Sequence, residues 1–191
     1  IKKNIFVNMK EINNIRRELT CKLVEARTKV KRKIIINDVK LNYNEEKNYN
    51  YEVSVLVRTK EQLEASISQN DRIYTPSIEL YNKYKDNNKV YLRLPRVVNN
   101  YNYDAKNILV TELGGVHKYK DRNIISDYYL NVVNNYSIKY LLDNNVKRVT
   151  LSPEINYNLL EDYIKDKVEI IVYGKPELMI TKSCPIKEMS S

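Results

Sequence analysis

From residue 51 onward, short apolar runs alternate with amphipathic stretches only a few residues apart. Val53, Val55 and Val57 alternate with polar residues, and this two-residue period is typical of a β-strand. The stretch 60–68 that follows has the period of a short helix. Strands that alternate with helices pair in parallel through right-handed crossovers. The pattern therefore predicts an α/β fold.

The same alternation continues along the chain. Further strands are expected at 71–75, 90–94, 108–113, 124–126, 146–151 and 168–173. Further helices are expected at 78–85, 131–142 and 156–166, with loops at 97–106 and 114–123. The short connections favour a (β/α) TIM-like barrel or a partial barrel. An open doubly wound sheet is the competing architecture, although no strand is followed by a dinucleotide fingerprint or a P-loop.

The part of the chain before residue 51 has a different character. Residues 8–33 indicate one long helix, because Ile12, Ile15 and Leu19 begin a stripe of apolar residues at three- and four-residue steps. We expect a basic amphipathic helix over 1–36, a polar linker over 37–50, and a barrel-like domain over 51–191 that is truncated at its C-terminus. The first residue is not Met, which suggests a fragment of a longer chain.

The charge balance favours an acidic partner. The chain carries 33 Lys and Arg against 24 Asp and Glu, a net charge of +9, which suits RNA. The competing explanation is a genome rich in A and T, because Lys, Asn, Ile and Tyr codons are all abundant. No apolar run approaches the length of a membrane span. Two distant cysteines do not form a disulfide scaffold, so a cytoplasmic location is expected.

Polar side chains recur where the expected strands end, and in a barrel these ends form the working face. The candidates for substrate binding are Arg58, Arg93, Arg96, Glu112, Gly114, Gly115 and Ser152. The candidates for catalysis are Asp127, Asn131 and Glu154. Arginine binds anions through paired hydrogen bonds, and carboxylates act as acid or base groups. Two adjacent glycines permit positive φ and a close approach to a ligand.

Each candidate also has a purely structural interpretation. Asp127 and Ser152 are suitable helix caps, and Arg96 is a candidate partner for Glu112 or Glu154. The repetition at successive strand ends favours a common site.

Four stretches carry a family resemblance. They are the glycine turn at 114–115, Asp127–Asn134, Val149–Glu154, and Tyr173-Gly174 ahead of Leu178-Met179 and Cys184-Pro185. In this order they resemble peptidase family U-32, the collagenase-like family. Residues 11–18 and 53–64 are similar to a helix and a strand–helix pair of its long members. The chain departs from the family at Tyr129, where a serine is usual, so a direct role for that serine is not expected.

The resemblance implies a (β/α) barrel with an iron–sulfur cluster held by four cysteines. Cys184 corresponds to the first of these, and the other three are expected beyond Ser191, so the rest of its own longer chain is an expected partner. The activity implied is oxygen-independent hydroxylation of rRNA or tRNA bases, or of a quinone precursor. The alternatives are a collagenase-like peptidase and a non-catalytic RNA-binding section of a larger enzyme. The oligomeric state stays open.

Overall fold

The computed structural model describes residues 8–29, 51–156, 167–177, 179–181, 183–184 and 186. The chain divides into two compact units, Ile1–Val39 and Lys40–Ser191. The helix expected at 156–166 lies almost wholly outside the described residues, as does the linker expected at 37–50.

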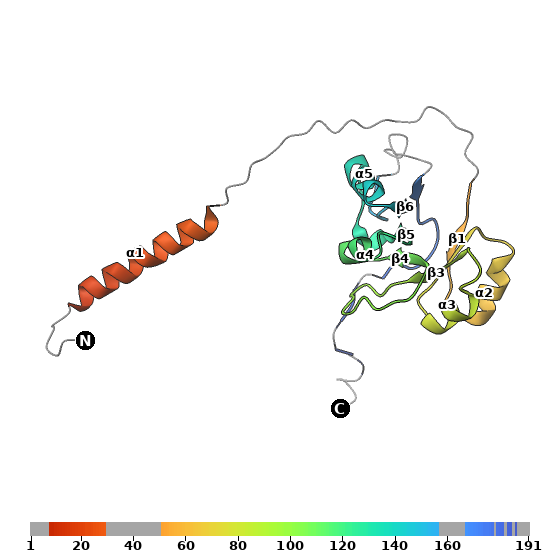
Figure 1. Cartoon of the computed structure of the whole chain (residues 1–191), viewed down its shortest axis with the longest axis horizontal. Coiled ribbons are helices and arrows are strands. Elements are labelled where there is room, and N and C mark those ends of the chain that lie inside the picture. The colour runs from red at the N-terminus through yellow and green to blue at the C-terminus, as the bar shows by residue number, and fades with distance from the viewer. Residues whose placement is uncertain are drawn as a thin grey trace. The chain divides into compact units, whose positions relative to one another are not determined.

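The described part of the first unit is one helix, α1 (Met9–Thr28), drawn in red in Figure 1. It begins where the sequence predicts, because the Asn8 side chain accepts a hydrogen bond from the backbone N–H of Lys10 at 3.0 Å. None of its residues is buried, including Ile12, Ile15 and Leu19 of the apolar stripe. The described helix is therefore amphipathic and exposed on all sides.

The second unit is built on a seven-stranded parallel sheet. The strands are β1 (Ser54–Leu56), β2 (Arg72–Thr75), β3 (Val90–Arg93), β4 (Asn107–Val110), β5 (Asn123–Ser126), β6 (Val146–Thr150) and β7 (Val168–Glu169). Their order in the sheet is their order in the chain. A doubly wound sheet reverses direction partway, so the competing architecture is wrong and the α/β prediction is confirmed.

Helices lie in four of the connections between described strands, as expected for parallel pairing, whereas β3 and β4 are joined by a loop. The helices are α2 (Lys60–Ile67), α3 (Ile78–Tyr84), α4 (Leu113–Lys118), the short 3₁₀ helix η1 (Tyr128–Leu130) and α5 (Asn135–Asp143). Side chains cap most of them: Thr59 and Gln62 form a capping box on α2, Ser77 caps α3 and Asn134 caps α5. Each such cap stabilises its helix by about 1 kcal/mol.

The two faces of the sheet have different partners. Residues such as Ile73, Ile108 and Ile124 form the main core with Leu63 of α2 and Ile138 of α5. Figure 1 shows α2 and α3 against the first strands and α4 and α5 against the later ones. The alternate residues on the opposite face form a second, smaller core of Tyr74, Tyr91, Leu109 and Ile125. The helices therefore cover one face of the sheet. On the other face, side chains of neighbouring strands pack against one another.

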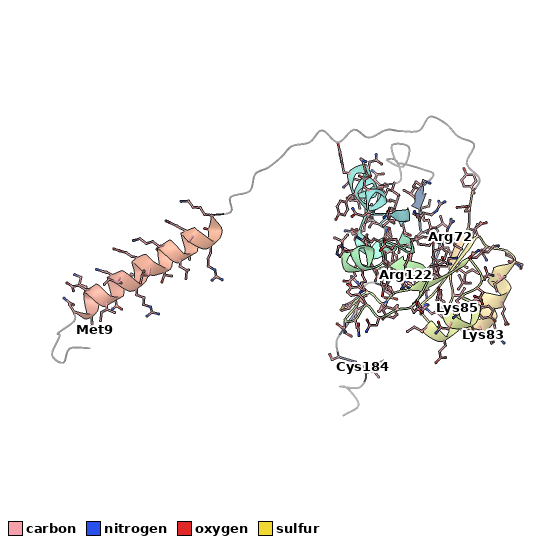
Figure 2. The ribbon with its side chains drawn as sticks, viewed as in Figure 1. Met9, Arg72, Lys83, Lys85, Arg122 and Cys184 are labelled. Carbon is pink, nitrogen blue, oxygen red and sulfur yellow. The ribbon has the colours of Figure 1, made fainter. Side chains whose placement is uncertain are left out.

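This second face is concave, because side chains from the two ends of the sheet meet across it. Glu169 of β7 accepts hydrogen bonds from Ser54 of β1 at 3.0 Å and from Arg72 of β2 at 2.9 Å. Tyr74 of β2 also donates to Glu169, at 2.9 Å. Figure 2 labels Arg72 among the strands. The sheet is therefore curled into a half-barrel, with β1 and β7 joined by side chains rather than by a backbone ladder.

Several element predictions were wrong in detail. The region 114–123 was expected as a loop, but most of α4 lies in it. Gly114 and Gly115 both belong to this short helix. The helix expected at 131–142 begins later, at Asn135, and η1 precedes it. The strand expected at 168–173 pairs with β6 only at Val168 and Glu169. Val172 and Tyr173 lie outside the ladder and are exposed.

Candidate anion-binding site at the carboxyl ends of the strands

Six side chains gather at one rim of the curled sheet, where the parallel strands end. We call this group the mouth, and it consists of Arg58, Arg93, Arg96, Asp127, Tyr129 and Glu177. Arg58 follows β1, Arg93 ends β3 and Asp127 follows β5. Because these strands are parallel, their carboxyl ends share one edge, and side chains far apart in sequence become neighbours.

The centre of the mouth is an ion pair between Arg93 and Asp127. The Arg93 Nε atom lies 2.7 Å from Asp127 Oδ2, and both side chains are more than nine-tenths buried. The other Asp127 oxygen, Oδ1, accepts from the backbone N–H of Tyr129 at 3.2 Å, so Asp127 also caps η1. Asp127 is therefore both the cap of η1 and a member of the mouth.

Burial acts on both partners of this pair. It raises the pKa of Asp127 above its ordinary value, while the Arg93 guanidinium opposes the rise. Burial alone lowers the pKa of Arg93, but the Asp127 carboxylate and the Tyr129 hydroxyl together more than offset this, and the pKa of Arg93 is raised. A guanidinium held in this way keeps its charge at every physiological pH.

Tyr129 forms an aromatic surface beside the pair. The guanidinium carbon of Arg96 lies 4.7 Å from the centre of the Tyr129 ring, and that of Arg93 lies 5.1 Å from it. These are distances at which a cation is attracted to an aromatic face. The neighbouring Tyr128 ring lies 4.4 Å from the Tyr129 ring at a tilted angle. The structural interpretation predicted that Arg96 pairs with Glu112 or Glu154. Arg96 instead stacks on Tyr129.

Glu177 completes the mouth from the segment after β7. Its Oε1 atom lies 3.6 Å from Arg93 Nη1 and 4.0 Å from Arg58 Nη2. Its other oxygen accepts a hydrogen bond from the Tyr129 hydroxyl, and its backbone N–H donates to Tyr128 Oη at 3.2 Å. One residue of the tail therefore contacts side chains that follow or end β1, β3 and β5.

The contacts of Glu177 favour its charged form. The hydrogen bond from Tyr129 is the largest influence and lowers the pKa of Glu177, and Arg93 lowers it further although burial opposes both. Burial and the Glu177 carboxylate together raise the pKa of Tyr129, so its hydroxyl stays a donor. The mouth thus holds a carboxylate among cationic and hydroxyl donors.

The mouth has an excess of positive charge. Three arginines face two carboxylates, and Arg58 and Arg96 are both exposed, with 67% of the Arg58 side chain accessible. Exposed guanidinium groups beside an aromatic ring are suited to phosphate groups and to stacked bases. Chemically, the arrangement can hold an oxyanion, with Arg93 fixed and the two outer arginines able to move.

Other predicted site residues lie beside the mouth in a separate cluster. The Glu112 carboxylate accepts from the Tyr101 hydroxyl, which raises the pKa of Tyr101 to about 12. A Cβ atom on Gly114 would come within 2.2 Å of that hydroxyl, and one on Gly115 would lie 3.2 Å from Val110. Neither glycine has positive φ, so the close neighbours, Tyr101 at exposed Gly114 and Val110 at buried Gly115, favour glycine here rather than an unusual backbone.

The last three candidates follow β5 and β6. Asn131 is exposed with φ 50°, a left-handed conformation that asparagine tolerates, and it ends η1. Ser152 is buried, and its hydroxyl accepts from the backbone N–H of Glu154 at 3.3 Å. The Glu154 side chain is exposed. The structure therefore brings Arg58, Arg93, Arg96 and Asp127 together, and among the described residues no hydrogen bond or ion pair joins these side chains to those of the remaining candidates.

The residues described do not form a metal centre. No group of three His, Cys, Asp or Glu with suitable positions occurs among them, and Cys184 is exposed. An iron–sulfur cluster takes four thiolates, whereas the whole chain contains two cysteines, one in each unit. These residues alone do not fit the cluster that the family resemblance implies. A peptidase needs a base beside a Ser or Cys nucleophile. Within the described part, His117, the one histidine of the sequence, is exposed on α4 and no hydrogen bond joins it to Ser152 or Cys184.

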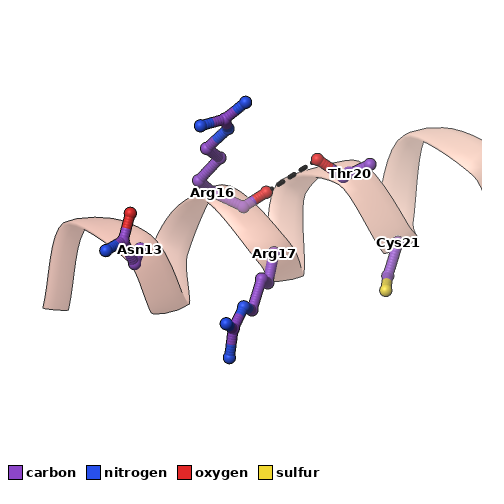
Figure 3. A pocket seen from close by; sticks show the side chains of 5 residues that line it. All are labelled: Asn13, Arg16, Arg17, Thr20 and Cys21. Atoms are coloured by element: carbon purple, nitrogen blue, oxygen red, sulfur yellow. Dashed lines mark hydrogen bonds between the residues drawn. The ribbon is translucent and has the colours of Figure 1, made fainter. Parts of the chain in front are cut away.

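The helix α1 is the other strongly basic feature. A shallow hollow on its surface is lined by Asn13, Arg16, Arg17, Thr20 and Cys21. Figure 3 shows Arg17 and Cys21 on one side of the helix and Arg16 on the other, with the Thr20 hydroxyl donating to the Arg16 carbonyl at 2.8 Å. These side chains do not converge on a common point. None of the described helices, α1 included, has the length and apolar character that crossing a membrane requires.

Two residues of the mouth were not predicted from the sequence. Tyr129 was noted only as a departure from the family pattern, and with 17 tyrosines in the chain no single one stands out. Glu177 lies in an irregular segment after the last strand, where no periodic pattern applies. Its contacts depend on the path that the segment after β7 takes across the strand ends. No local pattern in the sequence predicts that path.

Comparison with protein-family models, with curated proteins and with solved structures finds no match to this chain.

Proposed function

We propose that the mouth binds the phosphate groups and an unstacked base of RNA. We further propose that the chain is part of a U-32-type, iron–sulfur-dependent hydroxylase of rRNA or tRNA bases. The observation that carries the binding proposal is the convergence of Arg93 and Arg96 on the Tyr129 ring, with Arg58 close by at Glu177. RNA-binding sites commonly combine arginines for phosphate with aromatic rings for unpaired bases. The net charge of +9 adds long-range attraction.

In this proposal each mouth residue has a defined task. Arg58 and Arg96 contact phosphate, Tyr129 stacks with a base, and the Arg93–Asp127 pair fixes the position of the ring. Glu154, which is exposed after β6, is the candidate acid or base group. The cluster, bound by cysteines from outside these residues together with Cys184, would supply the redox chemistry. The half-barrel is proposed to be part of a complete (β/α) barrel.

Salt-dependent RNA binding tests this proposal. The full chain is titrated with total tRNA in a filter-binding assay between about 50 and about 200 mM salt. The double variant Arg58→Ala/Arg96→Ala should bind more weakly, and its slope against log salt should be smaller by about 1.4, the effect of two lost contacts to single-stranded phosphate.

A matched control removes the same charge elsewhere. Lys83 and Lys85 lie at the end of α3 and are exposed, as labelled in Figure 2. They precede β3, whereas the mouth lies at the carboxyl ends of the strands. The variant Lys83→Ala/Lys85→Ala should keep most of the affinity and the slope. Equal losses in the two double variants would mean that RNA responds only to total charge, and the proposed site would be rejected.

The hydroxylase activity needs its own test. Nucleosides from rRNA and tRNA of cells with and without the gene are compared by mass spectrometry. Loss of one hydroxylated base would support the activity, and an unchanged set of nucleosides would count against it. A further arm restores the gene with Arg58→Ala/Arg96→Ala and should fail to restore the base.

A further inference from the structure

The segment after β7 places its own anion in the mouth. The Glu177 carboxylate has Arg93 Nη1 at 3.6 Å and Arg58 Nη2 at 4.0 Å from one oxygen, and the Tyr129 hydroxyl on the other. Two guanidinium groups and a hydroxyl are the donors that proteins commonly use for a phosphate group. A tetrahedral oxyanion bound there would make the same contacts that Glu177 makes.

The two arginines hold this anion to different degrees. Arg93 is committed to Asp127 at 2.7 Å and is buried, so it stays in place when Glu177 leaves. Arg58 is mostly exposed, and its distance of 4.0 Å to Glu177 is the limit of an ion pair. Exposed ion pairs of this kind contribute about 1 kcal/mol or less. The carboxylate is therefore weakly held over a fixed cation and is replaceable.

The attachment of the tail depends on the same residue. Besides the side-chain contacts, the Glu177 backbone N–H donates to Tyr128 Oη at 3.2 Å. Within residues 170–177, this is the residue whose hydrogen bonds and ion pairs reach the mouth. Displacing its carboxylate would release the tail from the strand ends and free the Tyr129 hydroxyl.

We propose that Glu177 is an internal competitor for an oxyanion site between Arg58, Arg93 and Tyr129, and that a phosphate group displaces it and frees residues 170–177 from the mouth. The proposal deepens the RNA-binding function and rests on the same arginines, but it does not require the phosphate to belong to RNA. The shared chemistry is a phosphate group, from a nucleic acid or from a free phosphate.

Calorimetric titration of the full chain with inorganic phosphate at neutral pH tests the competition. Glu177→Gln removes the competing charge and keeps the size of the side chain, so phosphate should bind about fivefold more tightly than to wild type, the equivalent of one exposed ion pair. Asp86→Asn removes one charge from an exposed residue between α3 and β3, away from the carboxyl ends of the strands, and should change the affinity much less. Arg58→Ala should weaken binding in both backgrounds.

Amide hydrogen exchange tests the release of the tail. In wild type, phosphate should accelerate exchange in the peptide containing 170–177, whereas sodium chloride at equal ionic strength should not. Equal tightening in Glu177→Gln and Asp86→Asn, no tightening in Glu177→Gln, or unchanged exchange would each overturn the proposal. If phosphate displaces Glu177 while tRNA fails to bind, the RNA function falls and this inference stands. If tRNA binds through the mouth arginines while Glu177→Gln has no effect on phosphate binding, the RNA function stands and this inference falls.

Discussion

At the scale of single residues, the Arg93–Asp127 pair is the fixed point of the mouth. Both side chains are buried, and each satisfies the charge of the other. Taking two charges out of water costs several kcal/mol, so such a pair persists only when its geometry is good. Removing one member would leave the other buried and uncompensated, which makes this pair sensitive to substitution.

We expect Asp127→Asn to destabilise the protein by about 3 kcal/mol, because it removes the buried counter-charge of Arg93 and leaves it only the more exposed Glu177, while still allowing a cap on η1. Urea unfolding at neutral pH measures this loss. The control is Asp143→Asn, which breaks an exposed pair with Lys139 within one helix and should cost under about 0.5 kcal/mol. Losses of similar size in the two variants would contradict the assignment of a buried pair.

The residue scale also shows what sequence reasoning can reach. Arg58, Arg93 and Asp127 were predictable because each lies directly after or at the end of a strand with a clear apolar pattern, and parallel strands end on one edge. Whether Arg96 would meet a carboxylate or an aromatic ring depends on the path of the loop after β3, which has no periodicity. Glu112 and Gly114 lie close to one another but contact Tyr101, a residue of a loop that sequence patterns leave unplaced.

At the scale of elements, burial depends on which face of an element a residue occupies. Ile73 of β2 is fully buried in the main core, whereas Ile78 at the start of α3 is half exposed. We expect Ile73→Ala to lower the free energy of unfolding by about 2 to 5 kcal/mol, because it leaves a cavity between the sheet and its helices. Ile78→Ala should cost much less, and urea unfolding of the two variants makes the comparison. A larger loss for Ile78→Ala would show that the assignment of faces is wrong.

The ends of the half-barrel are joined by charged groups. Glu52, just before β1, lies 2.6 Å from Arg72 Nη2 of β2 and 2.7 Å from Arg148 Nη2 of β6. The hydrogen bond from Arg72 is the main cause that lowers the pKa of Glu52 below its ordinary 4.5. The sequence indicates none of these contacts, because they depend on the curvature of the sheet.

The lowered pKa of Glu52 predicts a pH dependence. The unfolded chain takes up a proton at Glu52 at a higher pH than the folded one, so the stability that Glu52 provides is present above pH 4.5 and is lost as the pH falls through its folded pKa. Glu52→Gln should therefore be less stable than wild type at neutral pH, and the difference should shrink in acid. Urea unfolding over a pH series measures it, with the exposed Glu79→Gln as control. A difference that grows in acid would contradict the ion pairs.

At the scale of the whole molecule, alternation of strands and helices predicted a parallel α/β sheet, and the short connections favoured a barrel-like sheet over the doubly wound alternative. The extent of the last strand and the start of α5 were not predictable, since pairing and capping decide them rather than propensity. Two basic features compete as the RNA-binding surface: the mouth and α1. On α1, Arg16 and Arg17 point to different sides of the helix, whereas at the mouth Arg93 and Arg96 meet at one ring.

The most direct test of the central claim, that the mouth is where RNA binds, is to map ultraviolet cross-links between the full chain and a uridine-rich single-stranded RNA by mass spectrometry. We expect adducts in the peptide containing Tyr128 and Tyr129, and we expect them to disappear in Arg58→Ala/Arg96→Ala. Adducts confined to residues of α1, and unchanged in that variant, would contradict the claim.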